Sequence, residues 1–164
     1  MDWKGKPEKI ISGGQTGVDR AALQAALKLE IEVGGWCPPG RASEDGWIPS
    51  QYPLKETPRE KSESAPDIPR SLRTEWNVRD ADATLIFEPK DMQIEDQGTV
   101  WTKTCCLKMN KPVLLCDPFD SDCKRKIEDW LDIINPIVLN VAGPSENVVP
   151  GIFATTYETL IEVF

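Results

Sequence analysis

Short apolar runs alternate along the chain with stretches in which apolar residues recur every three or four positions. The short runs predict β-strands at residues 9–12, 32–36, 83–87, 112–116 and 137–141. The spaced apolar residues predict helices at 18–29, 69–80, 99–109, 121–134 and 151–163. Strands that alternate with helices in this way are typical of a parallel sheet covered by helices. The pattern therefore predicts an α/β fold built on a mainly parallel sheet of about five strands.

Residues 38–68 interrupt this alternation. They are rich in Pro, Ser, Glu and Lys and have no steady apolar period. Loops of this length inside a compact domain are uncommon and are often functional. The first half contains Arg41, two acidic residues and Trp47, the composition of a binding loop, whereas the second half is typical of a solvated surface segment. The total length of 164 residues is that of one domain.

Charge and residue usage narrow the possible functions. The chain has 27 acidic and 19 basic side chains and a net charge of −8. Proteins that bind nucleic acid usually carry a basic surface, so a small ligand or another protein is the favoured partner. The chain contains no histidine, which removes the usual general base at neutral pH and the commonest metal ligand. Any catalysis would use carboxylates, Arg, Lys or Cys, and no metal site is predicted.

The five cysteines favour a reduced, cytoplasmic chain, because they are odd in number and have no C-x-x-C spacing. Cys105, Cys106 and Cys116 are expected to be buried as small apolar side chains. Cys37 is the one expected beside a cleft. The sequence shows no secretory leader and no apolar run near the membrane-spanning length of about 18 residues, so a membrane partner is not expected.

The first candidate binding segment is SGGQTG, residues 12–17, between the first predicted strand and the first predicted helix. Ligands of parallel sheets bind where loops leave the carboxyl ends of the strands, and the free N–H groups of a helix N-terminus attract anions. Gly13, Gly14 and Gly17 would allow left-handed backbone angles and close approach of a ligand, with Gln15 and the hydroxyl of Thr16 between them. The string is neither a P-loop nor G-x-G-x-x-G. Taken alone, it fits a phosphate site and a simple tight turn equally well.

A capping box supplies the second interpretation of this segment. Thr16-x-x-Asp19 could close the helix without any ligand. A phosphate placed directly against Asp19 would be repelled by it. The two interpretations are compatible if Asp19 caps the helix, or accepts a hydrogen bond from a sugar or pterin beside the anion.

A second candidate group lies on the helix predicted at 69–80. Arg73, Asn77 and Asp80 share one face of that helix, where Arg73 could bind an anion. The alternative is a surface helix with an internal pair between Glu75 and Arg79, and that alternative is favoured for this segment by itself.

Two more segments follow predicted strands. Gly98 and Thr99 open a helix after the third strand and repeat the arrangement of residues 12–17, so both helix N-termini are expected to face one crevice. The string NVAGPSEN, residues 140–147, follows the fifth strand and reaches the same edge of the sheet. An ordinary Gly-Pro turn is slightly favoured for this last string.

Four strings in this order resemble the "putative molybdenum carrier" family: SGGQTGVDRAAL, GGWCPPGRASEDGWIPSQYPL, RTEWNVRDADATLI and LNVAGP. This family looks like a branch of the Rossmann-like group that contains the molybdenum-cofactor carrier proteins and the lysine-decarboxylase-like phosphoribohydrolases. The resemblance implies that residues 1–164 form a single Rossmann-like, doubly wound domain. It also implies self-association and a nucleotide or phosphorylated pterin bound over the first and third strand ends.

One string departs from the phosphoribohydrolase pattern P-G-G-x-G-T-x-x-E, in which the glycines hold phosphate and the Glu serves catalysis with an Arg. The corresponding string here is IEDQGTVWT, residues 94–102. Gly98 and Thr99 match, but neither of the first two glycines is present, Asp96 stands at the second of them, and Thr102 replaces the Glu. N-glycosidic hydrolysis is therefore disfavoured.

The leading hypothesis is a non-catalytic, homo-oligomeric carrier or sensor whose ligand is molybdenum cofactor or a nucleotide. Backbone N–H groups of the two glycine segments would hold the phosphate, arginines would add charge-assisted bonds, and Asp19, Asn77 or Asp80 would recognise hydroxyl or amine edges. The predicted ligand-binding residues are Gly13, Gly14, Gln15, Thr16, Gly17, Asp19, Arg41, Arg73, Asn77, Gly98 and Thr99.

Two further hypotheses stay open. The first is a hydrolase of nucleotides or phosphoribosyl compounds with Glu44, Asp45 or Asp19 as acid or base, since burial can raise the pKa of a carboxyl group into the useful range. The second is a scaffold whose ligand site has lost its function and whose Trp101 or Trp130 contributes to oligomer contacts.

Overall fold

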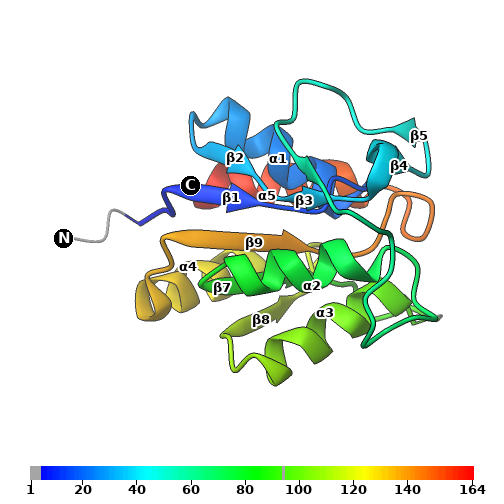
Figure 1. Cartoon of the computed structure of the whole chain (residues 1–164). Helices are drawn as coiled ribbons and strands as arrows, with labels where there is room; N and C mark the ends of the chain where they lie inside the picture. Colours follow the sequence, from blue (N-terminus) through cyan, green and yellow to red (C-terminus); the bar gives the residue numbers. More distant parts are fainter. Residues whose placement is uncertain (1–4, 94) are drawn as a thin grey trace.

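The centre of the structure is a five-stranded parallel sheet (Figure 1). The structure is a computed structural model that describes residues 5–93 and 95–164. The strands of this sheet are β1 (Lys9–Ile11), β2 (Glu32–Gly34), β7 (Ala83–Phe87), β8 (Val113–Cys116) and β9 (Val138–Ala142). Their order is β2-β1-β9-β7-β8, and every neighbouring pair is parallel. The prediction of an α/β fold with a parallel sheet of about five strands is confirmed.

Five α-helices cover the two faces of the sheet. They are α1 (Val18–Lys28), α2 (Ser71–Asp80), α3 (Gln97–Lys108), α4 (Cys123–Ile134) and α5 (Ile152–Val163). Helices α1, α5 and α4 pack side by side on one face, and α2 packs with α3 on the other (Figure 1). The fold is therefore doubly wound, as in Rossmann-like proteins.

The last strand occupies the middle of the sheet, which the sequence pattern did not predict. Strand β9 pairs with β1 on one side, where Ile10 faces Leu139, and with β7 on the other, where Leu85 faces Val141. If β9 is counted as strand 1, the order of the sheet becomes 3-2-1-4-5. This is the order of the first five strands of a Rossmann dinucleotide-binding sheet. The first and third predicted strands are therefore separated by the fifth.

The spacing of apolar residues along each strand and helix explains how the sheet and the helices pack together. The inner strand β7 is buried at every position, ATLIF, as expected for a strand with helices on both faces. Helix α1 buries a stripe that includes Ala22, Leu23 and Ala26 against the sheet and α5. Helix α4 buries Ile127 and Leu131 in the same core. Cys105, Cys106 and Cys116 are buried as predicted, and Cys37 is buried too.

The long segment 38–68 contains short ordered elements. A 3-10 turn η1 (Pro39–Arg41) leads into the two-stranded hairpin of β4 (Ala42–Ser43) and β5 (Gly46–Trp47), and β6 (Lys55–Glu56) pairs with β3 (Trp36–Cys37). The predicted strand at 32–36 ends at Gly34 because Gly35, with φ of +123°, turns the chain between β2 and β3. The hairpin lies beyond the carboxyl ends of the central strands (Figure 1).

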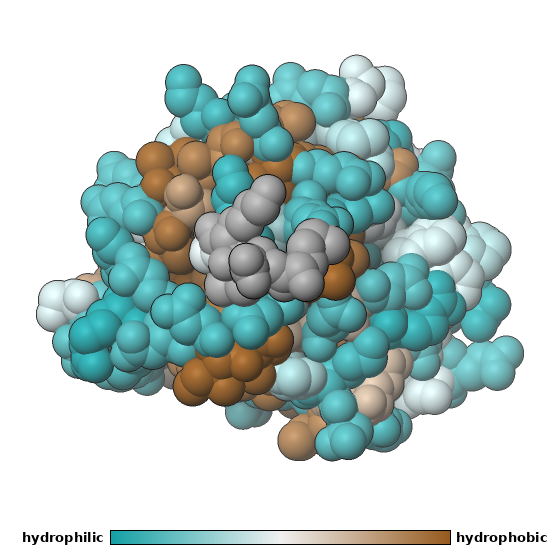
Figure 2. Space-filling model, turned by 90° about the vertical axis from the view of Figure 1, so that its left-hand side faces the viewer, coloured by the Kyte–Doolittle hydropathy of each residue, from teal (hydrophilic) through white to brown (hydrophobic). Residues whose placement is uncertain are grey.

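Two features concern the surface. Figure 2 shows the end of the molecule at which the strands begin, where several separate hydrophobic patches lie between hydrophilic residues. Exposed apolar side chains include Ile133 near the end of α4 and Ile137 just before β9. Within the described residues, no helix is both long and apolar enough to cross a membrane.

Candidate functional site

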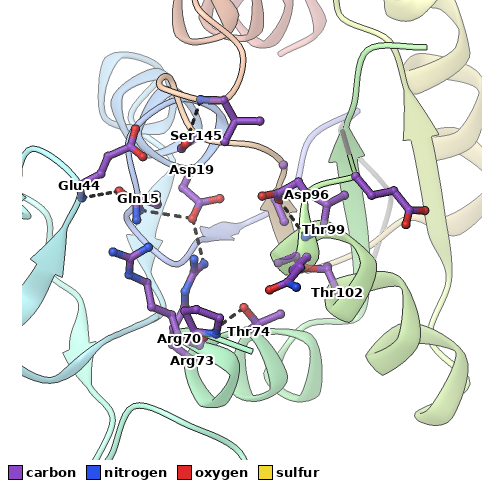
Figure 3. Close-up of a pocket in the computed structure, with 17 residues that line it drawn as sticks. Gln15, Asp19, Glu44, Arg70, Arg73, Thr74, Asp96, Thr99, Thr102 and Ser145 are labelled. Atoms are coloured by element: carbon purple, nitrogen blue, oxygen red, sulfur yellow. Dashed lines mark hydrogen bonds and ion pairs between the residues drawn. The ribbon is translucent and has the colours of Figure 1, made fainter. Parts of the chain in front are cut away.

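A cavity of about 350 Å³ opens at the carboxyl ends of β1, β9 and β7 (Figure 3). The order of the sheet changes direction between β9 and β7, so the loops after these strands diverge to opposite faces and leave a crevice there. The lining residues are Gln15, Asp19, Glu44, Pro69, Arg70, Arg73, Thr74, Glu95, Asp96, Gln97, Gly98, Thr99, Thr102, Ala142, Gly143, Ser145 and Val148. The cavity therefore combines the segments that follow these three strands with the start of α2.

Side chains of the protein occupy most of the backbone N–H groups in the loop after β1. The N–H of Gly14 donates to Ser12 Oγ at 3.4 Å, that of Gln15 to Asp19 Oδ2 at 3.3 Å, and that of Thr16 to Gln15 Oε1 at 3.0 Å. Residues 14–17 were expected to offer these groups to a phosphate. Three of the four N–H groups already have partners, so side chains are the better candidates for binding a ligand here.

The predicted capping box does not form. The N-cap of α1 is Gly17, and no side chain of the described residues caps it. The hydroxyl of Thr16 donates to Glu44 and accepts from the N–H of Glu146 at 3.2 Å, while Asp19 bonds to the N–H of Gln15, one residue before Thr16. Gly17, with φ of +81° and ψ of −128°, turns the chain so that Thr16 points toward the loops and not along the helix.

Gln15 presents a fixed donor. Its Oε1 accepts from the N–H groups of Thr16 at 3.0 Å and of Glu44 at 2.9 Å, which determines how the amide group is oriented. Its Nε2 is buried and has no hydrogen-bond partner among the described residues, and the residue as a whole is only 7% exposed. A buried amide donor without a partner is costly, so this atom indicates a place for an acceptor that a ligand would supply.

Asp19 and Arg73 form an ion pair in the wall of the cavity (Figure 3). Arg73 Nη1 lies 3.0 Å from Asp19 Oδ2, and the side chains are 14% and 2% exposed. Burial raises the pKa of Asp19 from 3.8 to about 6, because the loss of hydration outweighs the attraction of Arg73 and the hydrogen bond from Gln15. The Nε atom of Arg73 is buried without a partner among the described residues.

Gly13 allows Arg73 to reach this position. A methyl group at Gly13 would lie 1.9 Å from Arg73 Nη1. Gly14 and Gly17 have positive φ angles of 80° and 81°, so these two glycines allow the loop its backbone conformation. Gly13 instead leaves room for a guanidinium group that crosses the loop.

The second predicted helix N-terminus is capped by its own acidic residue. Asp96 Oδ2 accepts from the N–H of Thr99 at 3.0 Å and from the Thr99 hydroxyl at 2.6 Å. Gly98 and Thr99 do line the cavity, as expected. The N–H of Thr99 is nevertheless occupied, and a carboxylate stands where the phosphoribohydrolase pattern has a glycine.

Glu44 connects the hairpin loop to the cavity. Its carboxylate accepts from the Thr16 hydroxyl and from the N–H of Asn147 at 3.0 Å. Burial acts to raise the pKa of Glu44, but hydrogen bonds from Thr16, Asn147 and Ser145 together lower it below its ordinary value. Two carboxyl groups of one cavity, Glu44 and Asp19, therefore have pKa values shifted in opposite directions.

Two residues that were expected to bind ligand instead contact protein groups outside the cavity lining. The Arg41 guanidinium donates to four backbone carbonyl groups of the long segment, those of Ile48, Pro49, Tyr52 and Leu54. Asn77 Nδ2 donates to the Trp36 carbonyl at 3.0 Å, and its Oδ1 accepts from the Trp36 N–H at 2.8 Å. Both residues shape the loop that follows β2.

Contacts also decide the roles of Arg79 and of two tryptophans. Arg79 pairs with Asp80 at 2.8 Å, and not with Glu75 as the helical spacing suggested. Trp101 is 5% exposed and donates through Nε1 to the Ser71 carbonyl, so it packs between α2 and α3 and is unavailable for oligomer contacts. Trp130 is partly buried against the main core.

Several residues of the cavity were not predicted as ligand contacts. Gly143 and Ser145 line it, although the sequence favoured an ordinary turn for NVAGPSEN. A methyl group at Gly143 would lie 2.4 Å from the Phe87 carbonyl, which shows how closely this loop passes the end of β7. Arg70 lies at the start of α2, one helical turn before Arg73, and that spacing was the signal that could have identified it.

No group of three or more His, Cys, Asp or Glu side chains in residues 5–93 and 95–164 is arranged to hold a metal ion. The polar groups of the cavity include carboxylates, guanidinium groups, hydroxyls and side-chain amides. These groups suit a small ligand that offers both acceptors and donors.

Fold and site together define the class: a Rossmann-like α/β protein with a polar ligand cavity at the switch point of its sheet. Residues 10–164 match the family described as "Circularly permutated YpsA SLOG family", and the chain belongs to this family. A sheet whose order becomes 3-2-1-4-5 when its last strand is counted first agrees with that description.

A solved structure provides the second comparison. The crystal structure of a "Putative molybdenum carrier protein" from Syntrophus aciditrophicus is 40% identical in sequence and superposes with a TM-score of 0.83. The alignment covers 96% of this chain and 94% of the other. The sequence-based assignment to the molybdenum carrier family is thereby confirmed. No curated protein gives a significant match.

Proposed function

We propose that the protein is a carrier or sensor that binds a phosphorylated heterocycle in the cavity between β1, β9 and β7. The observation that carries the proposal is the buried Gln15 Nε2, a donor fixed in orientation and left without a partner among the described residues, in the same cavity as the Arg73 guanidinium. Such a pair of donors suits a phosphoryl group or a carbonyl edge of a heterocycle. The solved relative, described as a "Putative molybdenum carrier protein", supports molybdenum cofactor as the ligand, and a nucleotide is the alternative.

Arg73 has the central role in this proposal. Its guanidinium is held in an ion pair within the lining of the cavity, and its Nε is a second buried donor without a partner among the described residues. Asp19 Oδ2 accepts a hydrogen bond from Arg73 Nη1 and so holds the guanidinium in place. Thr74, Thr102 and Ser145 would contact hydroxyl groups of a ligand, since all three line the same cavity.

The test begins with native mass spectrometry of freshly purified protein, which identifies any co-purified ligand. Isothermal titration with AMP and GMP then compares the natural protein with Arg73→Ala. We expect binding to weaken about 10- to 100-fold, because a hydrogen bond to a charged group contributes about 1.5–3 kcal/mol. Gly13→Ala should also weaken binding, since its methyl group displaces the Arg73 guanidinium without removing the charge.

Arg125→Ala is the matched control, because Arg125 pairs with Asp129 on the exposed side of α4, far along the chain from the cavity segments. Its affinity should equal that of the natural protein. Equal affinity of Arg73→Ala and the natural protein would contradict the proposal.

One observation favours a second function, a nucleotide or phosphoribosyl hydrolase. The pKa of Asp19 is raised to about 6 while that of Glu44 is lowered, the pattern of an acid and a base in one site. The same AMP samples, incubated and analysed for free adenine by chromatography, separate the two functions. Release of adenine that is lost in Asp19→Asn would support the hydrolase, and binding without release would support the carrier.

A further inference from the structure

The charges around the cavity are unbalanced. Among the described residues, four carboxyl groups line it, those of Asp19, Glu44, Glu95 and Asp96, against two guanidinium groups, those of Arg70 and Arg73. When all six are ionised, the lining has an excess of negative charge. An anionic ligand therefore needs a rearrangement of charge as it enters, beyond the contacts already described.

The ionised form of Asp19 is stabilised by its ion pair with Arg73. The carboxylate is 2% exposed, and Arg73 Nη1 is the cationic group 3.0 Å from it. Further charged groups that face it are Asp96 from the start of α3, which opposes its ionisation, and Glu44, Glu95 and Arg70 from the remaining walls of the cavity. An anion that engages Arg73 leaves Asp19 with weaker compensation and adds a further negative charge nearby.

We propose that the site binds a monophosphate by transferring Arg73 from Asp19 to the phosphoryl group, while Asp19 takes up one proton from solvent. This inference rests on the proposed function and defines its ligand class. No covalent bond in the ligand changes: the phosphoryl group gains the Arg73 hydrogen bonds, and Asp19 becomes a neutral carboxylic acid that still accepts from the Gln15 N–H. The buried Gln15 Nε2, on a residue 7% exposed, provides a second donor for the same ligand.

The charge balance also limits the number of phosphoryl groups. One phosphoryl group carries up to two negative charges near neutral pH, and Arg73 and Arg70 offer it two positive charges once Asp19 is neutral. A second or third phosphoryl group would meet Glu95 and Asp96, and the described lining offers it no further guanidinium or ammonium group. The cavity should therefore prefer a nucleoside monophosphate over a di- or triphosphate.

The inference agrees with the pKa of Asp19 when Arg73 is in contact with it. Its pKa is already raised to about 6 by burial, with Arg73 in contact. Removal of Arg73 to a ligand raises that pKa further, so that a proton is held at neutral pH. Asp19 therefore takes up the proton when the phosphoryl group binds and releases it when the phosphoryl group leaves.

The test is isothermal titration of the full chain with AMP, ADP and ATP in buffers of different ionisation enthalpy, at about pH 7.5, where the phosphate of AMP is already almost fully ionised. The dependence of the heat on the buffer gives the number of protons taken up. We expect uptake of about one proton per AMP and at least about tenfold weaker binding of ATP. The affinity for AMP should fall by up to about tenfold when the pH is raised by one unit.

Asp19→Asn should take up no proton and should bind AMP with an affinity that is independent of pH over the same range. Asp129→Asn is the matched control, because Asp129 pairs with Arg125 at the surface of α4, and it should behave as the natural protein. If Asp19→Asn does not fold, the natural protein suffices, since its proton uptake should disappear by about pH 5, where Asp19 already carries the proton when the cavity is empty.

The outcomes separate this inference from the proposed function. AMP binding without proton uptake, or equal affinities for AMP and ATP, overturns the inference and leaves the proposed function standing. If none of the three nucleotides binds, the inference is overturned, and the proposed function is overturned as well if native mass spectrometry finds no phosphorylated ligand on the purified protein.

Discussion

At the scale of single residues, the burial of Asp19 disfavours its charged form more than the ion pair with Arg73 favours it. The folded state raises the pKa of Asp19 from 3.8 to about 6. Between these two pH values the folded protein holds a proton that the unfolded chain releases. The stability contributed by this group is therefore highest below about pH 4, falls as the pH rises to about 6, and stays low above that.

This sign gives a prediction for Asp19→Asn. The variant is neutral at every pH, so its free energy of unfolding relative to the natural protein should rise by about 3 kcal/mol between about pH 4 and pH 7, and then level off. Urea unfolding of both proteins at several pH values measures this difference. Differences between the two proteins isolate Asp19, since all other carboxyl groups are shared. A difference that does not change with pH would show that Asp19 is ionised at little cost.

The sequence predicted only part of this residue-level arrangement. Helical spacing predicted that Arg73 and Asn77 share one face of their helix, but only Arg73 of the two lines the cavity. Its partner Asp19 is 54 residues away, and no local pattern records that contact. The cap of α3 could have been predicted, because Asp96 stands three residues before Thr99 in the usual position of an N-cap.

At the scale of elements, the loops that form one side of the cavity pack closely against each other at Gly17. A methyl group there would lie 2.6 Å from the Pro144 carbonyl and 2.7 Å from the Glu146 N–H nitrogen, both in the loop after β9. The hydroxyl of Thr16, in the preceding residue, contacts both Glu146 and Glu44. The loops after β1 and β9 and the hairpin loop therefore form one wall of the cavity.

We expect Gly17→Ala to lower the free energy of unfolding by more than about 2 kcal/mol, because positive φ strain of about 1–3 kcal/mol adds to a clash with backbone atoms. Chemical denaturation measures the loss. Gly40→Ala is the matched control, since Gly40 has φ of +73° but no atom within 4 Å of the added methyl group. Equal losses in the two variants would mean that the contact with the β9 loop contributes nothing to stability.

Element boundaries show where sequence patterns suffice. All five predicted helices and all five predicted strands exist, and the strand at 83–87 has the predicted bounds, because a short run rich in β-branched and aromatic residues is bounded there by Asp82 and Glu88. The short strands β3 to β6 were missed because two-residue pairings depend on distant partners, such as Trp36 with Lys55, and leave no periodic signal.

At the scale of the whole molecule, the position of β9 determines the site. Its insertion between β1 and β7 brings Gly143 and Ser145 into the lining of the cavity. The sequence could not show this, because each strand pattern indicates that a strand exists and not which neighbours it takes. The cavity expected over the first and third strands is in fact bordered by three strands.

The topology predicts that the chain tolerates a new order of its elements. The C-terminus and the start of β1 lie at the same end of the molecule (Figure 1), so a Gly/Ser linker can join the ends of the chain, which can be opened at residue 136, between α4 and β9. The permuted chain begins with β9 and α5, and its sheet order reads 3-2-1-4-5 in sequence. We expect cooperative unfolding and the same stabilisation by AMP, about 2.7 kcal/mol at a concentration one hundred times the dissociation constant.

A control permutant opened between Gly13 and Gly14 cuts the loop that holds Gln15 and Arg73, so it should lose the stabilisation by AMP. Loss of cooperative unfolding in the first permutant would show that the order of the chain, and not the arrangement of the strands, is what the fold requires.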